Sequence, residues 1–225
     1  MSSSENEKKQ AAIESVKWVK EGMLVGLGSG STAAHMVREL GIKVADGLSI
    51  QGVPSSDATA DLARKVGISL ISLDEAGTLD LNIDGADEFD SQFQLIKGGG
   101  GALLREKIVA HNSKVNLIIA DSGKQVDRLG RFKLPIETIP FATQNIMEEL
   151  ETMGLHPVLR KKDSEPYKTD ENNCIIDIDV FEQENLSELN NQIINIPGVV
   201  ETGLFLDTTD IIIMGKGDTT VVFKK

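Results

Sequence analysis

The chain is poor in cysteine, histidine and aromatic residues, and each shortage argues against one class of protein structure or site. Cys174 is the only cysteine among 225 residues, so no disulfide can form within the chain and a reducing, cytoplasmic setting is expected. The three histidines are scattered and predict no metal site, and no apolar run is long enough to span a bilayer. Because only 4% of the residues are aromatic, the core must be mostly aliphatic, which favours layered α/β packing.

The charge of the chain restricts its partners. With 23 basic and 35 acidic side chains the net charge is -12, and such a surface repels nucleic acid and anionic membranes. No nucleic acid and no membrane is therefore expected as a partner. A phosphorylated small molecule would need a locally positive pocket.

Short apolar runs alternate with helical patterns over the first half of the chain. The predicted strands lie at residues 23–25, 49–53, 80–83 and 115–119. The predicted helices between them lie at residues 31–40, 57–66 and 102–112. This alternation predicts βαβ units and a Rossmann-like parallel sheet. Ligands bind beyond the carboxyl ends of such strands, so the polar clusters that follow them are expected to converge on one cleft. These clusters are residues 26–32, 54–57, 84–88 and 121–124.

A second, smaller α+β domain is predicted from about residue 131 to about residue 203. Leu134-Pro135 and Ile139-Pro140 are typical of a linker. Helix, strand, strand, helix and strand are then expected, in that order, at residues 143–153, 157–160, 174–180, 187–194 and 197–200. The strand-like tail is expected to return to the first domain, which would comprise residues 1–130 and about 204–225. Residues 1–7 are expected to be a frayed tail before a helix.

The glycine-rich segment 26–32 follows a predicted strand and opens a helix. Glycines permit close backbone approach, and a helix N-terminus offers free N–H groups to an anion. A dinucleotide site is disfavoured because Ser31 replaces the third glycine of the G-x-G-x-x-G pattern. A Walker loop is excluded because Gly-Lys-Ser/Thr is absent. Taken alone, a tight turn with a capped helix explains the segment as well as phosphate binding does.

Two further segments carry candidate chemistry. The turn Asp84-Gly85-Ala86-Asp87-Glu88 places three carboxylates close together after a strand. This spacing fits a site for a ligand or a cation, and it fits an acidic surface turn equally well. Lys97 precedes four consecutive glycines, and a backbone that approaches a ligand explains this costly run best.

Glu106 and Lys124 are single candidates for acid–base and phosphate chemistry. Glu106 is expected to share a helix face with Ala102, Val109 and Ala110, which suits a general base. An exposed glutamate paired with a lysine is the commoner situation. Lys124 could reach a phosphate from the fourth strand end, or be only a turn lysine.

Together, and in order, these segments resemble the ribose-5-phosphate isomerase A family over nearly the whole chain. The segments that carry the resemblance are 26–33, 54–59, 84–88, 97–100 with 105–107, 121–124 and 196–205. The resemblance implies an aldose–ketose isomerase that interconverts D-ribose 5-phosphate and D-ribulose 5-phosphate through an enediolate, in the non-oxidative branch of the pentose phosphate pathway. It also implies no cofactor, no metal, and a homodimer or homotetramer.

The resemblance further implies roles for individual residues. Glu106 would move the proton, Asp84 and Asp87 would hold sugar hydroxyls, and Lys97 would stabilise the enediolate oxygens. The other implied substrate and phosphate contacts are Lys8, Ser29, Gly30, Ser31, Thr32, Gly85, Ala86, Gly98, Gly99, Gly100 and Lys124. Leu104 and Gly123 depart from the family pattern, and neither departure removes a proposed catalytic group.

Two other functions compete with this hypothesis. A sugar-phosphate sensor on the same fold would bind without turnover, but would usually carry a DNA-binding helical segment, and none is visible in the sequence. A nucleotide-dependent dehydrogenase is disfavoured by the loop spacing at residues 26–32.

Overall fold

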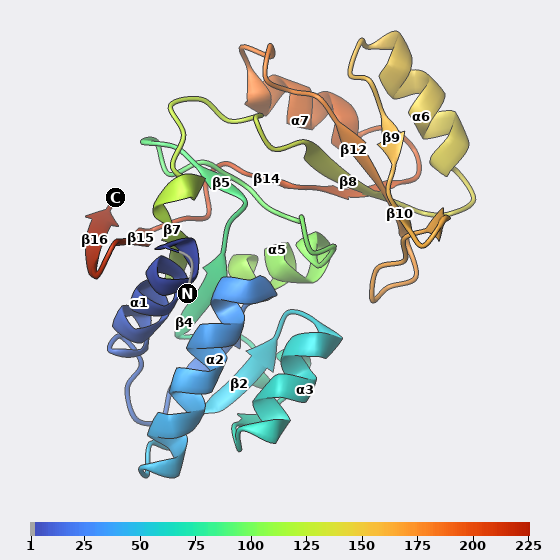
Figure 1. Cartoon of the computed structure of the whole chain (residues 1–225). Helices are drawn as coiled ribbons and strands as arrows, with labels where there is room; N and C mark the ends of the chain where they lie inside the picture. Colours follow the sequence, from blue (N-terminus) through green and yellow to red (C-terminus); the bar gives the residue numbers. More distant parts are fainter. Residues whose placement is uncertain (1–2) are drawn as a thin grey trace. The chain divides into compact units, whose positions relative to one another are not determined.

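The computed structural model describes residues 3–225, and the chain divides into two compact units (Figure 1). Unit 1 comprises residues 3–86, 105–125 and 207–225, and unit 2 comprises residues 87–104 and 126–206. The sequence predicted a boundary near residue 130, with residues 87–104 in the first domain. They fall in unit 2 because strand β6 (Leu95–Ile96) pairs with β14 (Leu204–Phe205).

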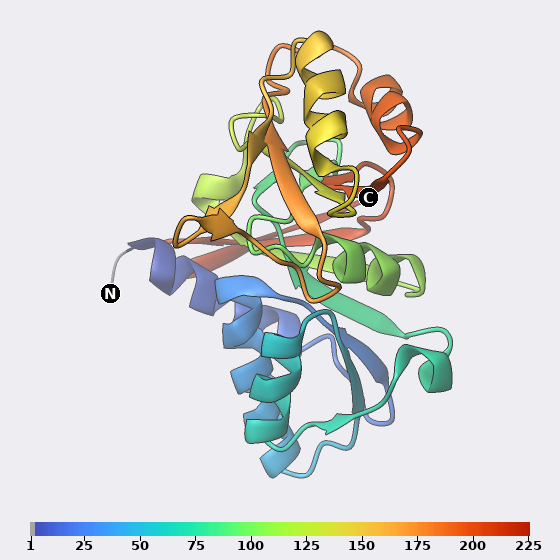
Figure 2. The same cartoon turned by 90° about the vertical axis from the view of Figure 1, so that its right-hand side faces the viewer.

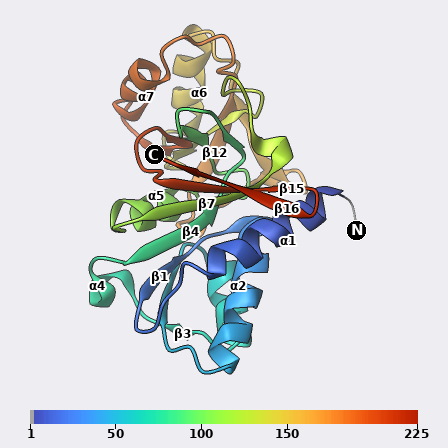
Figure 3. The ribbon, with the colours of Figure 1, turned by 90° about the vertical axis from the view of Figure 1, so that its left-hand side faces the viewer.

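Unit 1 is built on a seven-stranded sheet in the order β16-β15-β7-β4-β1-β2-β3. Its strands are β1 (Leu24–Leu27), β2 (Gln51–Pro54), β3 (Ser69–Leu70), β4 (Leu81–Gly85), β7 (Asn116–Asp121), β15 (Ile211–Lys216) and β16 (Thr219–Lys224). All neighbours pair in parallel except β15 and β16. The predicted α/β class with a parallel sheet is confirmed, and Figure 3 shows the returning strand β15 beside β7.

The helices of unit 1 cover both faces of this sheet. They are α1 (Ser3–Val16), α2 (Gly30–Ala45), α3 (Asp57–Lys65), α4 (Leu73–Ala76), most of α5 (Leu103–His111), and the 3₁₀ turn η1 (Ser122–Lys124). Helices α1 and α2 pack on one face, over an aliphatic core that includes Val25, Leu27 and Ile83. On the other face, a Cβ at Gly26 would lie 2.7 Å from Val109 Cγ1. A glycine in β1 therefore lets α5 approach the sheet closely.

The N-terminal segment differs from its prediction. The described part of it, from Ser3, is already helical, and only Met1 and Ser2 of the predicted frayed tail lie outside the described residues. Glu7 is buried, and its carboxylate accepts hydrogen bonds from Ser122 and from the N–H of Gly217. These contacts span more than 100 residues, so local sequence could not indicate them.

Unit 2 is an antiparallel sheet in the order β13-β8-β12-β9, with two helices packed on it (Figure 2). The elements are β8 (Leu134–Thr138), α6 (Thr143–Thr152), β9 (Val158–Leu159), β12 (Cys174–Ile178), α7 (Leu186–Ile194) and β13 (Val199–Thr202). The core joins Ile146 of α6 and Ile193 of α7 to Ile136 and Ile176 of the sheet. Smaller pieces are the sheet β14-β6-β5, with β5 at Glu88–Phe89, and the hairpin of β10 (Lys161–Lys162) and β11 (Glu165–Pro166).

The expectation of a linker at Leu134-Pro135 was wrong. Residues 134–138 form β8, which is buried along its whole length and lies between β12 and β13. Pro135 cannot donate a hydrogen bond, but its carbonyl accepts one from the N–H of Gly203 at 2.7 Å. Burial of the neighbouring Leu134 and Ile136 outweighs the lost ladder bond, although proline usually argues against an interior strand.

No helix within residues 3–225 is both long and apolar enough to cross a membrane.

Candidate active site

The carboxyl ends of β1, β2, β4 and β7 lie at the same edge of the sheet in unit 1. Leu27 pairs with Pro54 and Ile83, and Gly85 pairs with Ile119. The polar segments that follow these strands therefore leave the sheet from one edge. This edge is where open parallel sheets place their ligands.

Asp84 is fixed at the end of β4 by the glycine loop that follows β1. Its side chain is 1% exposed, and Oδ1 accepts hydrogen bonds from the N–H of Ser29 (3.0 Å) and of Gly85 (2.7 Å). A Cβ at Gly28 would lie 2.2 Å from Asp84 Oδ1, so only glycine allows this approach. The loop thus holds one buried carboxylate in a single position.

A group of hydroxyls locks the same loop from the side. Ser29 Oγ lies 2.8 Å from Ser55 Oγ and 2.8 Å from Ser56 Oγ. Thr59 Oγ1 donates to the carbonyl of Gly28 at 2.9 Å. The 54–59 motif therefore shapes the loop that ends at the first turn of α2. The N–H groups of such a first turn lack partners within the helix and suit an anion.

Two lysines lie near this loop or at the neighbouring strand end. Lys8 Nζ donates to Ser31 Oγ at 3.1 Å, and Lys124 is half-buried in η1, directly after β7. Ser31 and Thr32 both belong to the first turn of α2.

Glu7 ties these elements together and was missed at the sequence level. Its carboxylate accepts from the N–H (3.0 Å) and Oγ (2.7 Å) of Ser122 in η1, and from the N–H of Gly217 (2.9 Å). The bond from Gly217 and those from Ser122 lower the pKa of Glu7 below its usual value. Glu7 therefore links α1, which carries Lys8, to η1, which carries Lys124.

Glu106 lies in the first turn of α5 and is 6% exposed. Val109 and Ala110, predicted to share its helix face, are also buried. The preceding Arg105 points elsewhere, since its Nη1 lies 2.8 Å from Asp57 Oδ1. A buried carboxylate on an aliphatic helix face is a suitable general base.

Unit 2 carries Asp87, Lys97 and the glycine run. Lys97 is 3% exposed, with Nζ 5.4 Å from the centroid of the Phe205 ring, and its N–H donates to Gly203 O at 2.9 Å. Asp87 Oδ2 accepts from the N–H of Gly99 at 2.7 Å, and a Cβ at Gly99 would lie 2.7 Å from Asp87 Oδ1. The glycine run thus approaches a carboxylate, as a loop built for close contacts should.

Glu88, the third carboxylate of the acidic turn, has a structural role. Its two oxygens accept from the N–H groups of Gly130 (2.7 Å) and Phe132 (2.6 Å). Across residues 3–225, no group of three His, Cys, Asp or Glu side chains is arranged to hold a metal ion. The three carboxylates are stabilised instead by backbone donors, which explains how like charges tolerate this spacing.

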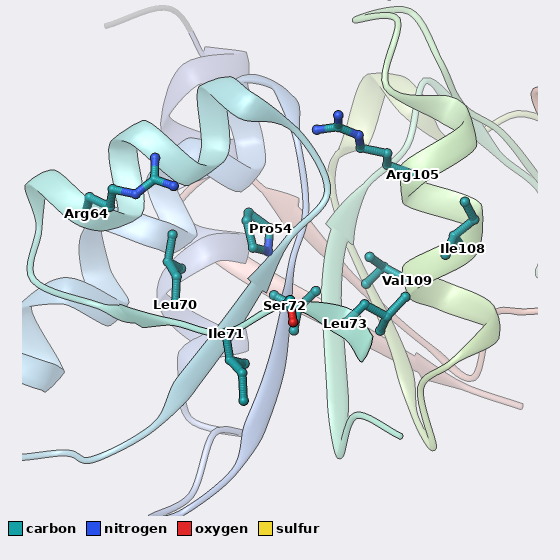
Figure 4. Close-up of a pocket in the computed structure, with 10 residues that line it drawn as sticks. Pro54, Arg64, Leu70, Ile71, Ser72, Leu73, Arg105, Ile108 and Val109 are labelled. Carbon is teal, nitrogen blue, oxygen red and sulfur yellow. The ribbon is translucent and has the colours of Figure 1, made fainter. Parts of the chain in front are cut away.

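A cavity of about 550 Å³ in unit 1 is lined mostly by aliphatic side chains, unlike the polar segments described above (Figure 4). Figure 4 shows Arg64 of α3 and Arg105 of α5 on opposite walls, with Pro54 between them. The rest of the lining is mostly aliphatic, and the two guanidinium groups pair with Asp61 and Asp57. Such a lining offers few partners for the hydroxyls of a sugar.

Comparison with known proteins assigns the family. The family model described as Ribose 5-phosphate isomerase A (phosphoriboisomerase A) matches residues 51–219, well over half of the chain. The chain belongs to the ribose 5-phosphate isomerase A family. The resemblance inferred from the ordered motifs is thereby confirmed.

Individual members of this family are similar to nearly the whole of this chain. "Ribose-5-phosphate isomerase A" of Ruegeria sp. strain TM1040 is 53% identical over 219 residues, which are 94% of this chain and 84% of that protein. The structure of ribose 5-phosphate isomerase A from Methanocaldococcus jannaschii has a TM-score of 0.92 at 40% identity, covering 97% of this chain and 98% of that one. A structure of D-ribose-5-phosphate isomerase in complex with phospho-erythronic acid has a TM-score of 0.93 at 38% identity, covering 97% of both chains.

Proposed function

We propose that the chain is a ribose-5-phosphate isomerase, which interconverts D-ribose 5-phosphate and D-ribulose 5-phosphate. Family membership carries this proposal, because relatives that bear this name match nearly the whole chain. The ligand of one similar structure also supports it. Phospho-erythronic acid carries a phosphate and a carboxylate, whose two coplanar oxygens resemble those of an enediolate.

Glu106 is the proposed base. It takes the proton from C2 of the aldose, which leaves an enediolate over C1 and C2. The proton of the C2 hydroxyl passes to O1, and Glu106 then delivers its proton to C1 on the same face, so that O2 becomes the carbonyl oxygen of the ketose. A buried, single carboxylate in the first turn of α5 supports this role. General-base catalysis typically contributes roughly 100- to 10,000-fold.

The developing negative charge on the reacting oxygens requires donors and cations. We assign this role to Lys97, with the backbone of Gly98, Gly99 and Gly100 beside it, because fixed donors at a developing oxyanion are among the strongest catalytic devices. Asp84 and Asp87 hold sugar hydroxyls and assist ring opening, with Gly85 and Ala86 beside them. Their hydrogen bonds to backbone N–H groups support these roles, since the carboxylates are held in place before substrate arrives.

The phosphate is anchored by the loop after β1 and by lysines. The proposed contacts are Lys8, Ser29, Gly30, Ser31, Thr32 and Lys124. The N-terminus of α2 and the contact between Lys8 and Ser31 support this anchor. Anchoring the unreactive end of the sugar positions the reacting carbons.

A coupled assay for D-ribulose 5-phosphate formed from D-ribose 5-phosphate tests the proposal. Turnover that persists after exhaustive chelation is expected, because the proposed mechanism uses no metal. Binding of phospho-erythronic acid without any turnover would favour a sugar-phosphate sensor instead.

We also propose that the chain acts in the cytoplasm as a homodimer or homotetramer. The single, buried Cys174 suits a reducing compartment. In unit 2, Phe141 is 95% exposed and Ile139 is 40% exposed, so a second copy of the chain would have apolar side chains to cover. Light scattering measures the assembly, and a monomer at micromolar concentration would contradict this part of the proposal.

A further inference from the structure

Arg160 organises the backbone of the glycine run in unit 2. Its Nη1 donates to the carbonyl of Gly98 at 2.8 Å and to the carbonyl of Gly99 at 3.2 Å. Its Nε donates to Asp177 Oδ2 at 2.9 Å, and its Nη2 donates to Asp177 Oδ1. The planar guanidinium is thus fixed by the Asp177 carboxylate on β12, and its third nitrogen, Nη1, donates to the glycine carbonyls.

These bonds also decide where the peptide N–H groups point. In a planar trans peptide the C=O and the following N–H point in opposite directions. Arg160 holds the carbonyls of Gly98 and Gly99, so the N–H groups of Gly99 and Gly100 face away from it. The first donates to Asp87 at 2.7 Å, whereas the N–H of the exposed Gly100 has no acceptor within residues 3–225.

Tyr167 holds the next peptide of the run. Its hydroxyl donates to the carbonyl of Gly100 at 3.0 Å. A Cβ at Gly101 would lie 2.5 Å from the Tyr167 ring, so the ring packs directly on this glycine. The N–H of Tyr167 donates to Arg160 O at 2.9 Å, which couples the two side chains that grip the run. Carbonyls of three successive glycines are therefore bound by two neighbouring side chains.

We propose that Arg160, supported by Asp177 and Tyr167, is a positioning residue for the isomerisation. It holds the peptide between Gly99 and Gly100 so that the N–H of Gly100 donates to the enediolate oxygens. The proposal rests on the proposed function, because it names the residue that aligns one of its oxyanion donors. Glycine peptides rotate easily, and a donor stabilises a transition state only when its orientation is fixed in advance.

Three variants remove the grip in different ways. Arg160→Gln removes the guanidinium group, and Asp177→Asn removes the charge of the carboxylate that holds this group. Tyr167→Phe removes the hydroxyl that donates to Gly100. Arg128→Gln is the matched control, because Arg128 also donates to a backbone carbonyl in unit 2, that of Gln183 at 3.0 Å. Steady-state kinetics, inhibition by phospho-erythronic acid, melting temperature and the amide NMR signals of Gly99 and Gly100 are measured for all four.

For Arg160→Gln, kcat is expected to fall about 10- to 100-fold, below the full loss of an oxyanion donor, while KM changes less than about threefold. Inhibition by phospho-erythronic acid should weaken in parallel, and the Gly100 amide signal should shift. Tyr167→Phe should show a smaller loss of the same kind, and Arg128→Gln none. Because the readout combines kcat, inhibitor affinity and one amide signal, a general loss of stability does not imitate it.

An unchanged kcat in Arg160→Gln would overturn the proposal, as would a loss of activity with an unaltered Gly100 amide signal. If Arg160→Gln does not fold, Asp177→Asn and Tyr167→Phe are judged by the same criteria. If the wild-type chain shows no turnover, the proposed function fails, and the amide signals then decide whether Arg160 orients this peptide.

Discussion

Replacing Glu7 by glutamine should weaken both the fold of unit 1 and the binding of substrate. The carboxylate accepts three hydrogen bonds, two from Ser122 and one from Gly217. A glutamine retains only one acceptor oxygen, and its amide group would face donors of Ser122. The change keeps size and shape, so the effect reports the loss of the charge and of the acceptor.

The magnitude follows from these bonds. Hydrogen bonds to charged groups contribute about 1.5–3 kcal/mol each, and neutral ones about 0.5–1.5 kcal/mol. Because η1 is partly exposed and water can replace part of the loss, we expect a destabilisation of about 2 kcal/mol. For a chain of this size this corresponds to a fall in melting temperature of about 4–8 °C. KM should rise as well, because Glu7 links the elements that carry Lys8 and Lys124.

The pH dependence gives a second readout with a definite sign. The folded-state pKa of Glu7 lies below the ordinary value of 4.5, so its stabilising contribution is present above that value and is lost as pH falls through the folded pKa. The stability gap between wild type and Glu7→Gln, measured by thermal melting from pH 3 to pH 8, should therefore close at low pH. Glu14→Gln is the control, because the Glu14 carboxylate of α1 forms an ion pair with the exposed Lys17 side chain. Equal melting temperatures at pH 7, or a gap that is constant with pH, would refute this reasoning.

Two further predictions concern candidate site residues of unit 1, and a third concerns the core of unit 2. Asp84→Asn keeps the acceptor Oδ1 but removes the charge, so turnover should fall at least about 100-fold with little change in melting temperature; normal turnover would return the acidic turn to a structural role. Lys124→Ala should raise KM at least about 10-fold with a smaller effect on kcat, as expected for a lost charged contact to phosphate, and ribose without phosphate should be a very poor substrate; equal use of ribose would exclude the anchor. Burial raises the folded-state pKa of Glu137 above 4.5, so stability should fall as pH rises through that pKa, and Glu137→Gln should melt higher than wild type at pH 8 but not at pH 4; parallel melting curves across this range would contradict this.

The parts of the fold that depend on local periodicity were predictable from the sequence. The apolar runs that form β1, β2, β4 and β7 are each followed closely by glycine or polar residues, and their parallel pairing follows from the intervening helices. Residues such as Asp84, Asp87 and Glu106 could be singled out because they stand beside glycine runs in short motifs. Their roles remain proposals, and the placement of Asp87 in unit 2 was not predicted, because it depends on the pairing of β6 with the distant β14.

The remainder depends on contacts between residues that are distant in sequence. Arg160 lies 62 residues from Gly98 and was predicted only as the last residue of a strand. Glu7 lies 115 residues from Ser122, within a segment that looked like a frayed tail. Pro135 indicated a linker because proline is rare inside strands. The contacts that keep it in β8 come from β12 and β13, which are distant in sequence. In each case tertiary packing overrides a local preference that sequence alone can show.

The kcat of Glu106→Gln with D-ribose 5-phosphate tests the central claim most directly. Glutamine nearly keeps the shape but cannot accept the proton from C2, so kcat should fall by at least about 100-fold, with a melting temperature close to that of wild type. Glu39→Gln, which changes another helical glutamate of unit 1, should leave kcat unchanged. A Glu106→Gln enzyme with turnover close to that of wild type would contradict the account, because no other carboxylate has been assigned to move the proton.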